Sequence, residues 1–203
     1  MEVEVARDRT LFTMAFARGR PQGKLKNAGA VNNRRGTTIR FRPDPQIFGA
    51  AAFKPARLFR LCRSKAYLFR GVEIRWRCDA ALLKGDDATP AEAVLHFPGG
   101  LADFLASATE GAEILTPRPF AGEAPMEGGG RVEWAVTWLL AGESFLSTYC
   151  NTVPTPLGGT HEQGFRAALV KGLRAYGEMT NNRRAAQITA EDVMGPAAAM
   201  LSA

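Results

Sequence analysis

The stretch Asn151-Thr-Val-Pro-Thr-Pro-Leu-Gly-Gly-Thr160-His-Glu-Gln-Gly-Phe-Arg166 is the most informative part of the 203-residue sequence. A strand over residues 145–151 is predicted to run into a turn rich in Pro and Gly. A helix is expected to begin at Thr160, with Glu162 in its first turn, where the helix dipole favours a negative charge. We therefore predict a rigid strand-loop-helix corner that presents Arg166 from the first turns of the helix.

The elements around this corner follow from hydrophobic periodicity. Residues 131–140 and 145–151 are predicted to form a long hairpin, joined at residues 141–143. In the helix expected over residues 160–179, one face is apolar and is predicted to pack on the core: Phe165, Leu169, Leu173 and Tyr176. Lys171 and Arg174 lie on the opposite side, with Arg166 at the border; this basic set is either a solvated face or a DNA-facing wall. A last helix is expected after Thr189, with Glu191 and Asp192 in its first turn.

The sequence before residue 131 is predicted to begin with a hairpin and to continue through a mobile loop into further strands and helices. The predicted strands and hairpin arms cover residues 2–7, 11–16, 36–42, 72–78, 92–97 and a short piece near Ile114; the helices cover residues 55–69 and 101–108; the loops and turns cover residues 19–33, 85–87 and 127–130. The breaker cluster Pro98-Gly-Gly100 is the best candidate for a domain boundary.

Lys65 breaks the pattern of its predicted helix, because it lies inside the apolar arc formed by residues such as Leu61 and Leu68. Either its side chain reaches solvent along an apolar stem, or it meets a buried carboxylate. Our hypothesis is the buried ion pair. It predicts that Lys65→Met lowers the melting temperature.

Composition is that of a soluble globular protein, with 46% hydrophobic and 23% charged residues. No run approaches the ~18 apolar residues needed to cross a bilayer, and the alternating start Met1-Glu-Val-Glu-Val is not typical of a signal peptide. The three widely spaced cysteines fit reduced thiols better than disulfides or a zinc site. We expect a cytoplasmic protein that does not bind membranes.

Charge is distributed unevenly along the chain. Residues 1–77 contain 18 Lys and Arg against 5 Asp and Glu, whereas residues 78–203 contain 8 against 15, so that the net charges are +13 and −7. A basic half of this strength favours an anionic partner, with nucleic acid or a nucleotide as the leading candidates. The alternative is a solvated surface enriched in arginine, since 20 of the 26 basic residues are Arg.

Several blocks of sequence resemble the ATP-operated B subunits of bacterial type IIA DNA topoisomerases. Beside Asn151-Thr, Gly158-Gly-Thr-His161 and Gly164-Phe-Arg166, they include Arg34-Arg-Gly-Thr-Thr38, His96-Phe-Pro-Gly-Gly-Leu101 and Ile188-Thr-Ala-Glu-Asp-Val193. The blocks follow the family's order over nearly the whole chain. The likeness is greater to the topoisomerase IV branch than to the gyrase branch, notably through Asn151-Thr-Val-Pro-Thr-Pro156.

This resemblance implies an α+β fold. Residues 1–97 would be the C-terminal part of a GHKL-type ATPase domain, an α/β sandwich, and residues 98–203 an incomplete transducer domain of ribosomal-S5-like fold. In the family, the B subunits bind ATP and Mg²⁺, dimerise on ATP binding and act with an A subunit to pass DNA through a double-strand break. The chain would then be a fragment of an ATP-hydrolysing enzyme that relays the ATP state to strand passage in relaxation or decatenation.

The resemblance also implies which site residues this chain holds. The family's catalytic glutamate, magnesium-binding asparagine, adenine-binding aspartate and Gly-rich lid are expected before Met1, and its ATP-sensing lysine after Ala203. Gly36 and Thr37 would contribute to the adenine side of the nucleotide site, and Arg7 would lie at its rim. Arg166 matches an arginine on the wall of the family's DNA cavity.

No catalytic or metal-binding residue is predicted within this chain. Phosphoryl transfer to water requires a positioned base, a metal ion and donors around the β- and γ-phosphates, and the sequence offers no such set. His161-Glu162 lacks the second histidine of a zinc-protease helix and is interpreted as a pair of first-turn residues. The fragment alone is therefore expected to be inactive. The alternative function is a stand-alone basic DNA-binding module without ATP-dependent activity.

Overall fold

The structure is a computed structural model that describes residues 1–50, 52–83 and 88–203. It divides into two compact units, Met1–Phe53 and Lys54–Ala203, and each unit is described by itself. Within the described residues, no helix combines the length and the apolar character needed to cross a membrane. The turn predicted around Gly85, Asp86 and Asp87 lies outside the described residues.

The first unit is an antiparallel sheet whose core is the predicted hairpin. Strands β1 (Glu2–Arg7) and β2 (Thr10–Ala17) pair from Glu2↔Ala15 to Arg7↔Thr10. Asp8 and Arg9 close the turn with φ of 51° and 58°, as expected for a two-residue hairpin loop whose twist matches the strands. Strand β5 (Gly36–Arg40) pairs with the other side of β1 and forms an edge of the sheet. The hairpin and this strand confirm the prediction.

Two parts of the first unit differ from the sequence prediction. The loop expected over residues 19–33 contains strands β3 (Arg20–Pro21) and β4 (Lys26–Ala30), both paired with β2. All residues of these strands are exposed, so no alternation of apolar residues could reveal them, and backbone pairing alone defines them. The short helix α1 (Pro45–Phe48) was also missed, although an N-cap Asp44 before Pro45 is a local signal that the sequence does contain.

The second unit begins with helix α2 (Pro55–Leu68), which packs on the two-stranded sheet of β6 (Glu73–Arg77) and β7 (Glu92–His96). Phe59 and Trp76 meet edge to face, with ring centroids 5.5 Å apart. A 3₁₀ turn, η1 (Ala80–Leu82), follows β6. The predicted helix and both strands are confirmed to within two residues at each end.

A five-stranded sheet in the order β11-β10-β12-β9-β8 forms the centre of this unit. Its strands are β8 (Phe120–Pro125), β9 (Arg131–Trp138), β10 (Phe145–Cys150), β11 (Val153–Pro154) and β12 (Ala197–Ser202). The predicted hairpin of the two segments now called β9 and β10 is wrong, because β12 lies between them, antiparallel to β9 and parallel to β10. Strand β12 was not predicted, since its sequence Ala-Ala-Ala-Met-Leu-Ser carries no alternation of polar and apolar residues.

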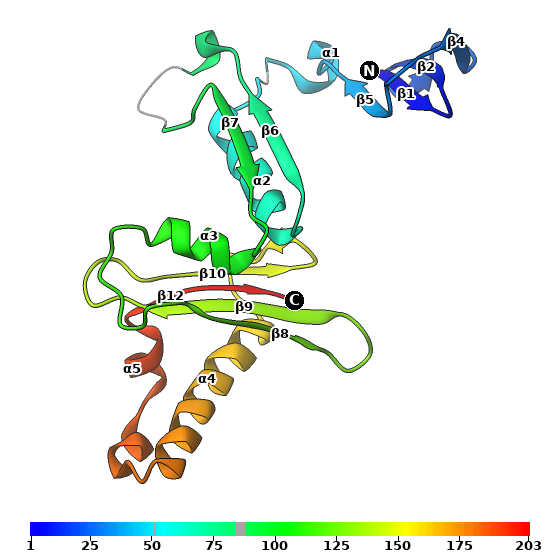
Figure 1. The fold of residues 1–203 in the computed structure, drawn as a ribbon. Coiled ribbons are helices and arrows are strands. Elements are labelled where there is room, and N and C mark those ends of the chain that lie inside the picture. Colours follow the sequence, from blue (N-terminus) through cyan, green and yellow to red (C-terminus); the bar gives the residue numbers. More distant parts are fainter. Residues whose placement is uncertain (51, 84–87) are drawn as a thin grey trace. The chain divides into compact units, whose positions relative to one another are not determined.

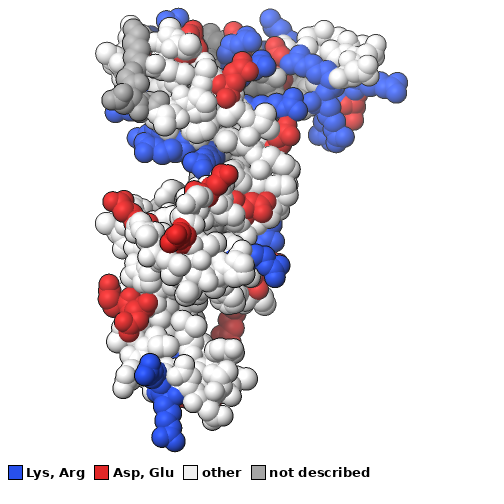
Figure 2. Space-filling model, turned by 60° about the vertical axis from the view of Figure 1, so that its left-hand side comes forward, with Lys and Arg blue, Asp and Glu red and all other residues white. Residues whose placement is uncertain are grey.

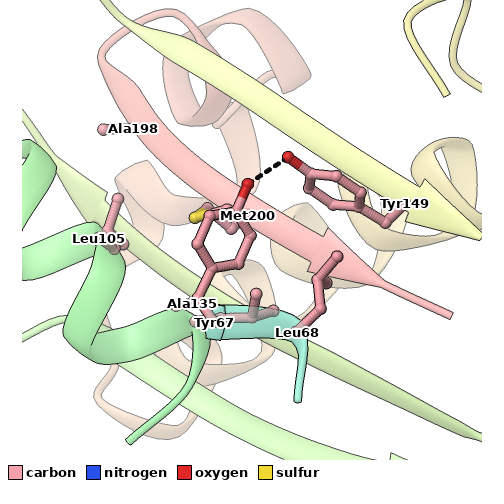
Figure 3. Packing of buried hydrophobic residues seen from close by; sticks show 8 residues of the cluster. Tyr67, Leu68, Leu105, Ala135, Tyr149, Ala198 and Met200 are labelled. Carbon is pink, nitrogen blue, oxygen red and sulfur yellow. Dashed lines mark hydrogen bonds between the residues drawn. The ribbon is translucent and has the colours of Figure 1, made fainter. Parts of the chain in front are cut away.

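Helices cover both faces of this sheet, as Figure 1 shows. Helix α3 (Leu101–Ala108) and the end of α2 pack on one face around Ala198 and Met200. Helices α4 (Thr160–Met179) and α5 (Ala190–Met194) pack on the other face around Ala199 and Leu201. Because side chains alternate along a strand, β12 supplies both cores at once. Figure 3 shows the first core, where the Tyr67 hydroxyl meets that of Tyr149 at 2.5 Å.

Helix α4 has the predicted limits, and most of its predicted core face is confirmed. Phe165 and Leu169 are buried and Leu173 packs beside them, but Tyr176 is 65% exposed and does not belong to the core. Helix α4 extends beyond the sheet (Figure 1), and a second 3₁₀ turn, η2 (Arg183–Gln187), packs against the last turns of α4. The predicted cap of α5 is confirmed as a capping box formed by Thr189 and Asp192.

Candidate functional site

The corner between β10 and α4 has the predicted strand-loop-helix form, with one addition. Asn151 and Thr152 adopt left-handed conformations, with φ of 47° and 64°. They reverse the chain so that β11 pairs back on β10, with Cys150 opposite Val153. Gly158 then turns the chain with φ of 73°, and α4 begins at Thr160. The corner is therefore a minimal hairpin followed by a glycine turn.

Hydroxyl and imidazole groups tie this corner together. The Oγ1 atoms of Thr148 and Thr155 lie 2.7 Å apart, and Nε2 of His161 lies 3.1 Å from Oγ1 of Thr155. These bonds join the end of β10 to the first turn of α4. His161 lies in the first turn of α4, as predicted. The network itself was missed, because no sequence pattern tells which hydroxyl groups meet across the turn.

Arg166 forms an ion pair within its own helix. Its Nε and Nη2 atoms each lie 2.9 Å from Oε1 of Glu162, one helical turn earlier. The Arg166 side chain is 40% exposed, so the guanidinium lies at the surface with part of its charge compensated. The spacing of four residues, with the acid first, is a signal that could have identified this pair from the sequence.

Lys171 and Arg174 line a groove of about 590 Å³ on the exposed side of α4, together with Glu178 and Ala190. The Arg174 side chain forms hydrogen bonds within the fold, because its Nε and Nη2 atoms donate to the Ile188 carbonyl at 2.9 and 2.5 Å. Lys171 forms no ion pair within the described residues. At ~100° per residue, Arg166, Arg174 and Lys171 spread over an arc of ~140° on one helix. The three predicted residues thus lie on one broad side of α4, which we call its basic side, although Glu178 lies within the same arc.

Arg7, Gly36 and Thr37 lie on the neighbouring strands β1 and β5 of the first unit. Ala6 pairs with Gly36 and Val5 with Thr37, so that Arg7 follows directly after the paired residues. Gly36 has φ of 116°, a conformation that side chains disfavour, and this explains why glycine opens the strand. Arg7 is 80% exposed and lies 3.4 Å from the carboxylate of Asp8. The structure therefore groups these three exposed residues at one end of the β1–β5 strand pair, in which β5 is the edge strand.

Lys65 does not meet a carboxylate, so the predicted buried ion pair is wrong. Its Nζ atom donates to the carbonyl and to Oγ1 of Thr152, at 2.8 and 2.7 Å. Two uncharged oxygens satisfy the ammonium at a half-buried position, where an ion pair was expected. The sequence shows that Lys65 lies in the apolar arc, but it does not show which group the ammonium meets.

Several groups in helix caps and in the core have a shifted pKa. Hydrogen bonds from the Gln46 amide and the Arg18 side chain lower the pKa of Asp44. Hydrogen bonds from the Thr189 hydroxyl and amide lower the pKa of Asp192. Burial, together with the hydrogen bond to Tyr149, raises the pKa of Tyr67. These shifts have structural causes.

Charged side chains gather on the surface as the sequence predicts. Figure 2 shows Lys and Arg side chains concentrated around the N-terminal part of the chain, and Asp and Glu more prominent around the five-stranded sheet and its helices. All three cysteines are free thiols, as expected. No cluster of three or more His, Cys, Asp or Glu residues suited to a metal ion occurs among residues 1–50, 52–83 and 88–203.

The comparison with known families defines the class of this protein. The sequence model of the DNA gyrase B family matches residues 100–203, which is just over half of the chain, and the chain therefore belongs to that family. The predicted relation to the B subunits of type IIA topoisomerases is confirmed.

Curated relatives identify the nearer branch of the family. The chain is 51% identical over 208 residues to the B subunit of DNA topoisomerase 4 from Caulobacter vibrioides, and 48% identical over 204 residues to that from Bartonella bacilliformis. Both matches cover all of this chain but only 30% and 29% of the relatives, so the chain spans less than a third of their length.

Solved structures confirm the α+β class. The B-subunit of the DNA gyrase from Myxococcus xanthus matches 99% of this chain with a TM-score of 0.80 and 27% identity, over 55% of its own length. The 43K ATPase domain of Thermus thermophilus gyrase B, solved in complex with an aminocoumarin, matches 99% with a TM-score of 0.77 and 28% identity, over 53% of its length.

Proposed function

We propose that this chain is part of the ATP-hydrolysing B subunit of a type II DNA topoisomerase of the topoisomerase IV branch, and that it relays the ATP state to DNA strand passage. The observation that carries the proposal is the match to topoisomerase 4 B subunits at 51% identity over the whole chain. In this proposal, residues 1–97 are the C-terminal part of the ATPase domain and residues 98–203 the transducer. The family match that begins at residue 100 supports this division. The compact units divide elsewhere, between residues 53 and 54, so the boundary near residue 98 stays a prediction.

The basic side of α4 is the part that we propose contacts DNA. Arg166, Lys171 and Arg174 all lie on this helix, and the Glu162–Arg166 pair holds one guanidinium at the surface. Phosphate contacts of this kind carry affinity without sequence preference and weaken as salt increases. DNA is therefore the proposed partner, together with an A subunit and a second B subunit that joins on ATP binding. With these partners, we propose that the protein acts in the cytoplasm.

The nucleotide contacts that we propose for this chain are limited to Arg7, Gly36 and Thr37. Their exposed place at one end of the β1–β5 strand pair fits a contribution to one side of a nucleotide site, with the Thr37 hydroxyl available as a hydrogen-bonding group. Among the described residues, no group of three or more His, Cys, Asp or Glu side chains could hold a metal ion. We therefore assign no step of ATP hydrolysis to this chain.

A chimaeric protein tests the enzyme assignment. The segments that flank this match in the Caulobacter vibrioides relative are joined before Met1 and after Ala203, and the product is assayed with the matching A subunit. We expect ATP-dependent relaxation of supercoiled DNA that is impaired by Thr37→Ala. A chimaera that folds but does not hydrolyse ATP would contradict the proposal and leave a stand-alone DNA-binding module as the better function.

DNA binding by the chain itself tests the role of α4. Fluorescence anisotropy with a duplex at several salt concentrations compares Arg166→Gln with Arg118→Gln, a matched control at an exposed arginine outside α4. Loss of a phosphate contact lowers affinity uniformly across sequences and reduces the salt slope by about 1. We expect this loss for Arg166→Gln and a smaller one for Arg118→Gln. Equal effects of the two variants would remove α4 from the proposed interface.

A further inference from the structure

The bond between Lys65 and Thr152 joins two segments that are 87 residues apart in the chain. Lys65 belongs to α2, and Thr152 belongs to the turn that leads from β10 towards α4. The ammonium holds the Thr152 carbonyl and hydroxyl together, at 2.8 and 2.7 Å. A charged donor that serves two acceptors of one residue fixes both the backbone and the side chain of that residue.

The turn that Lys65 holds is one that the local sequence disfavours. Asn151 tolerates the left-handed conformation, but a β-branched residue such as Thr152 adopts it at a clear cost. Such a conformation persists only when its surroundings determine it. Here both the backbone pairs of β11 and the bond from the Lys65 ammonium hold the turn.

The end of β10 connects this turn to both faces of the sheet. Tyr149 points to the face that carries α2, where its hydroxyl meets that of Tyr67 at 2.5 Å. Thr148, the preceding residue, points to the opposite face and bonds to Thr155, which in turn meets His161 in the first turn of α4. A shift of this strand end therefore acts on α2 and on α4 together.

A second anchor keeps the end of α2 on the sheet. Just beyond the helix, Nη2 of Arg70 lies 2.8 Å from Oε1 of Glu133 in β9, whose side chain is only 7% exposed. The end of α2 is thus bonded to β9 through Arg70 and to the turn after β10 through Lys65. The helix and this side of the sheet are expected to move as one body.

We propose that Lys65 is a positioning residue that locks the Asn151–Thr152 turn and thereby sets the start of α4, the helix that presents Arg166. This inference rests on the proposed function, because it treats α4 as the DNA-facing element. Through Lys65, a displacement of α2 reaches the corner directly, without passing through the core of the sheet. Lys65 bonds to Thr152, the chain then passes through β11 to Thr155, and Thr155 meets His161 in the first turn of α4.

Hydrogen exchange on the complete 203-residue chain tests the lock. The compared variants are Lys65→Met, Lys65→Arg and the matched control Lys54→Met, which removes an exposed lysine at the start of the same helix. The reporting amides are those of Asn151, Thr155 and Gly158, which donate to the carbonyls of Ala203, Thr148 and Thr155, respectively. We expect exchange of these amides to accelerate about tenfold in Lys65→Met. Lys65→Arg should restore most of the protection, and Lys54→Met should leave it unchanged.

DNA affinity measured on the same variants tests the positioning role. Lys65→Met and Lys54→Met remove the same charge, so a difference between them reports on geometry. We expect about threefold weaker binding for Lys65→Met than for Lys54→Met, with recovery in Lys65→Arg. Unchanged exchange in Lys65→Met overturns the proposal. Faster exchange with DNA affinity equal to that of Lys54→Met also overturns it, because the turn would then be held without positioning α4.

The experiments also cover two further outcomes: failure of Lys65→Met to fold, and absence of DNA binding through Arg166. If Lys65→Met does not fold, Thr152→Val replaces it: this variant removes the hydroxyl acceptor, keeps the carbonyl, and should accelerate exchange in the same amides by about threefold. No acceleration in Thr152→Val overturns the lock. If the wild-type chain does not bind DNA through Arg166, the proposed function of α4 fails, while the exchange data still decide whether Lys65 holds the turn.

Discussion

Replacing Gly177 by alanine should destabilise the second unit, although alanine is the better helix former. Gly177 is buried in the last turns of α4, where its carbonyl accepts a 2.7 Å bond from the Asn182 amide. A methyl group at this position would overlap the Cβ of Ala185 in η2, far inside van der Waals contact, and would lie 3.5 Å from the Asn182 carbonyl oxygen. Since carbon atoms pack at about 3.5 to 4.0 Å, α4 and η2 must move apart.

The size of the effect follows from two opposing contributions. Overpacking of a buried contact costs about 1 to 3 kcal/mol, whereas exchanging glycine for alanine inside a helix gains about 1 kcal/mol. The contact is backed by backbone on both sides, so we expect the upper part of this range and a net loss of about 1 to 2 kcal/mol. For a unit of this size, that loss lowers the melting temperature by about 3 to 6 °C.

Gly172→Ala is the matched control, because Gly172 lies on the exposed side of the same helix with no atom within 4 Å of the added methyl group. It should raise the melting temperature by about 2 to 4 °C. Tryptophan fluorescence is the suitable readout, since all three tryptophans (Trp76, Trp134 and Trp138) belong to the second unit. A rise for Gly177→Ala similar to that for Gly172→Ala would show that α4 and η2 are not in close contact.

Three further predictions concern charged groups. Glu162→Gln should strengthen DNA binding severalfold in anisotropy titrations, because it frees the Arg166 guanidinium from its partner; unchanged affinity would count against Arg166 as a phosphate contact. Glu133→Gln should lower the free energy of unfolding by about 1 to 2 kcal/mol in urea titrations, since the buried carboxylate loses its pair with the part-exposed Arg70. Because the pKa of Asp192 is lowered in the fold, its stabilising effect is present above the unfolded pKa and is lost as pH falls through the folded value; Asp192→Asn should flatten the dependence of the melting temperature on pH between about 5 and 3.

Elements with local signals were predicted well from the sequence. Helix α4 was found because its apolar residues recur every three to four positions and Thr160 follows a glycine pair, and the α5 cap was found because Thr189 precedes acidic residues at capping positions. The same holds for the β1–β2 hairpin, where alternation flanks a two-residue turn. In these cases the deciding contacts lie within a few residues of one another, so the sequence order already contains them.

Elements defined by distant partners were not predictable in the same way. Strand β12 separates β9 from β10, and nothing in the two earlier segments indicates that a strand more than 45 residues later pairs with both. Its small residues do not identify a strand, because alanine favours helices; they fit here because helices close on both faces of the sheet. Lys65 is a similar case, since its position in the apolar arc was clear but its partner Thr152 lies 87 residues away.

The residues of the candidate site were predicted from the sequence, whereas the net charge of the unit that contains them became clear only from the structure. The predicted DNA-binding residues lie in the unit of residues 54–203, which contains 16 Lys and Arg and 16 Asp and Glu and is therefore neutral, whereas residues 1–53 carry +6. A neutral unit attracts DNA weakly at long range, so binding through α4 depends on the local arrangement of Arg166, Lys171 and Arg174. Binding through the first unit depends on net charge instead. Variants that remove one charge from the first unit should therefore change DNA affinity by similar amounts at different positions. For variants on α4, the change in DNA affinity should depend strongly on position. This contrast distinguishes general attraction by net charge from a DNA contact of defined geometry.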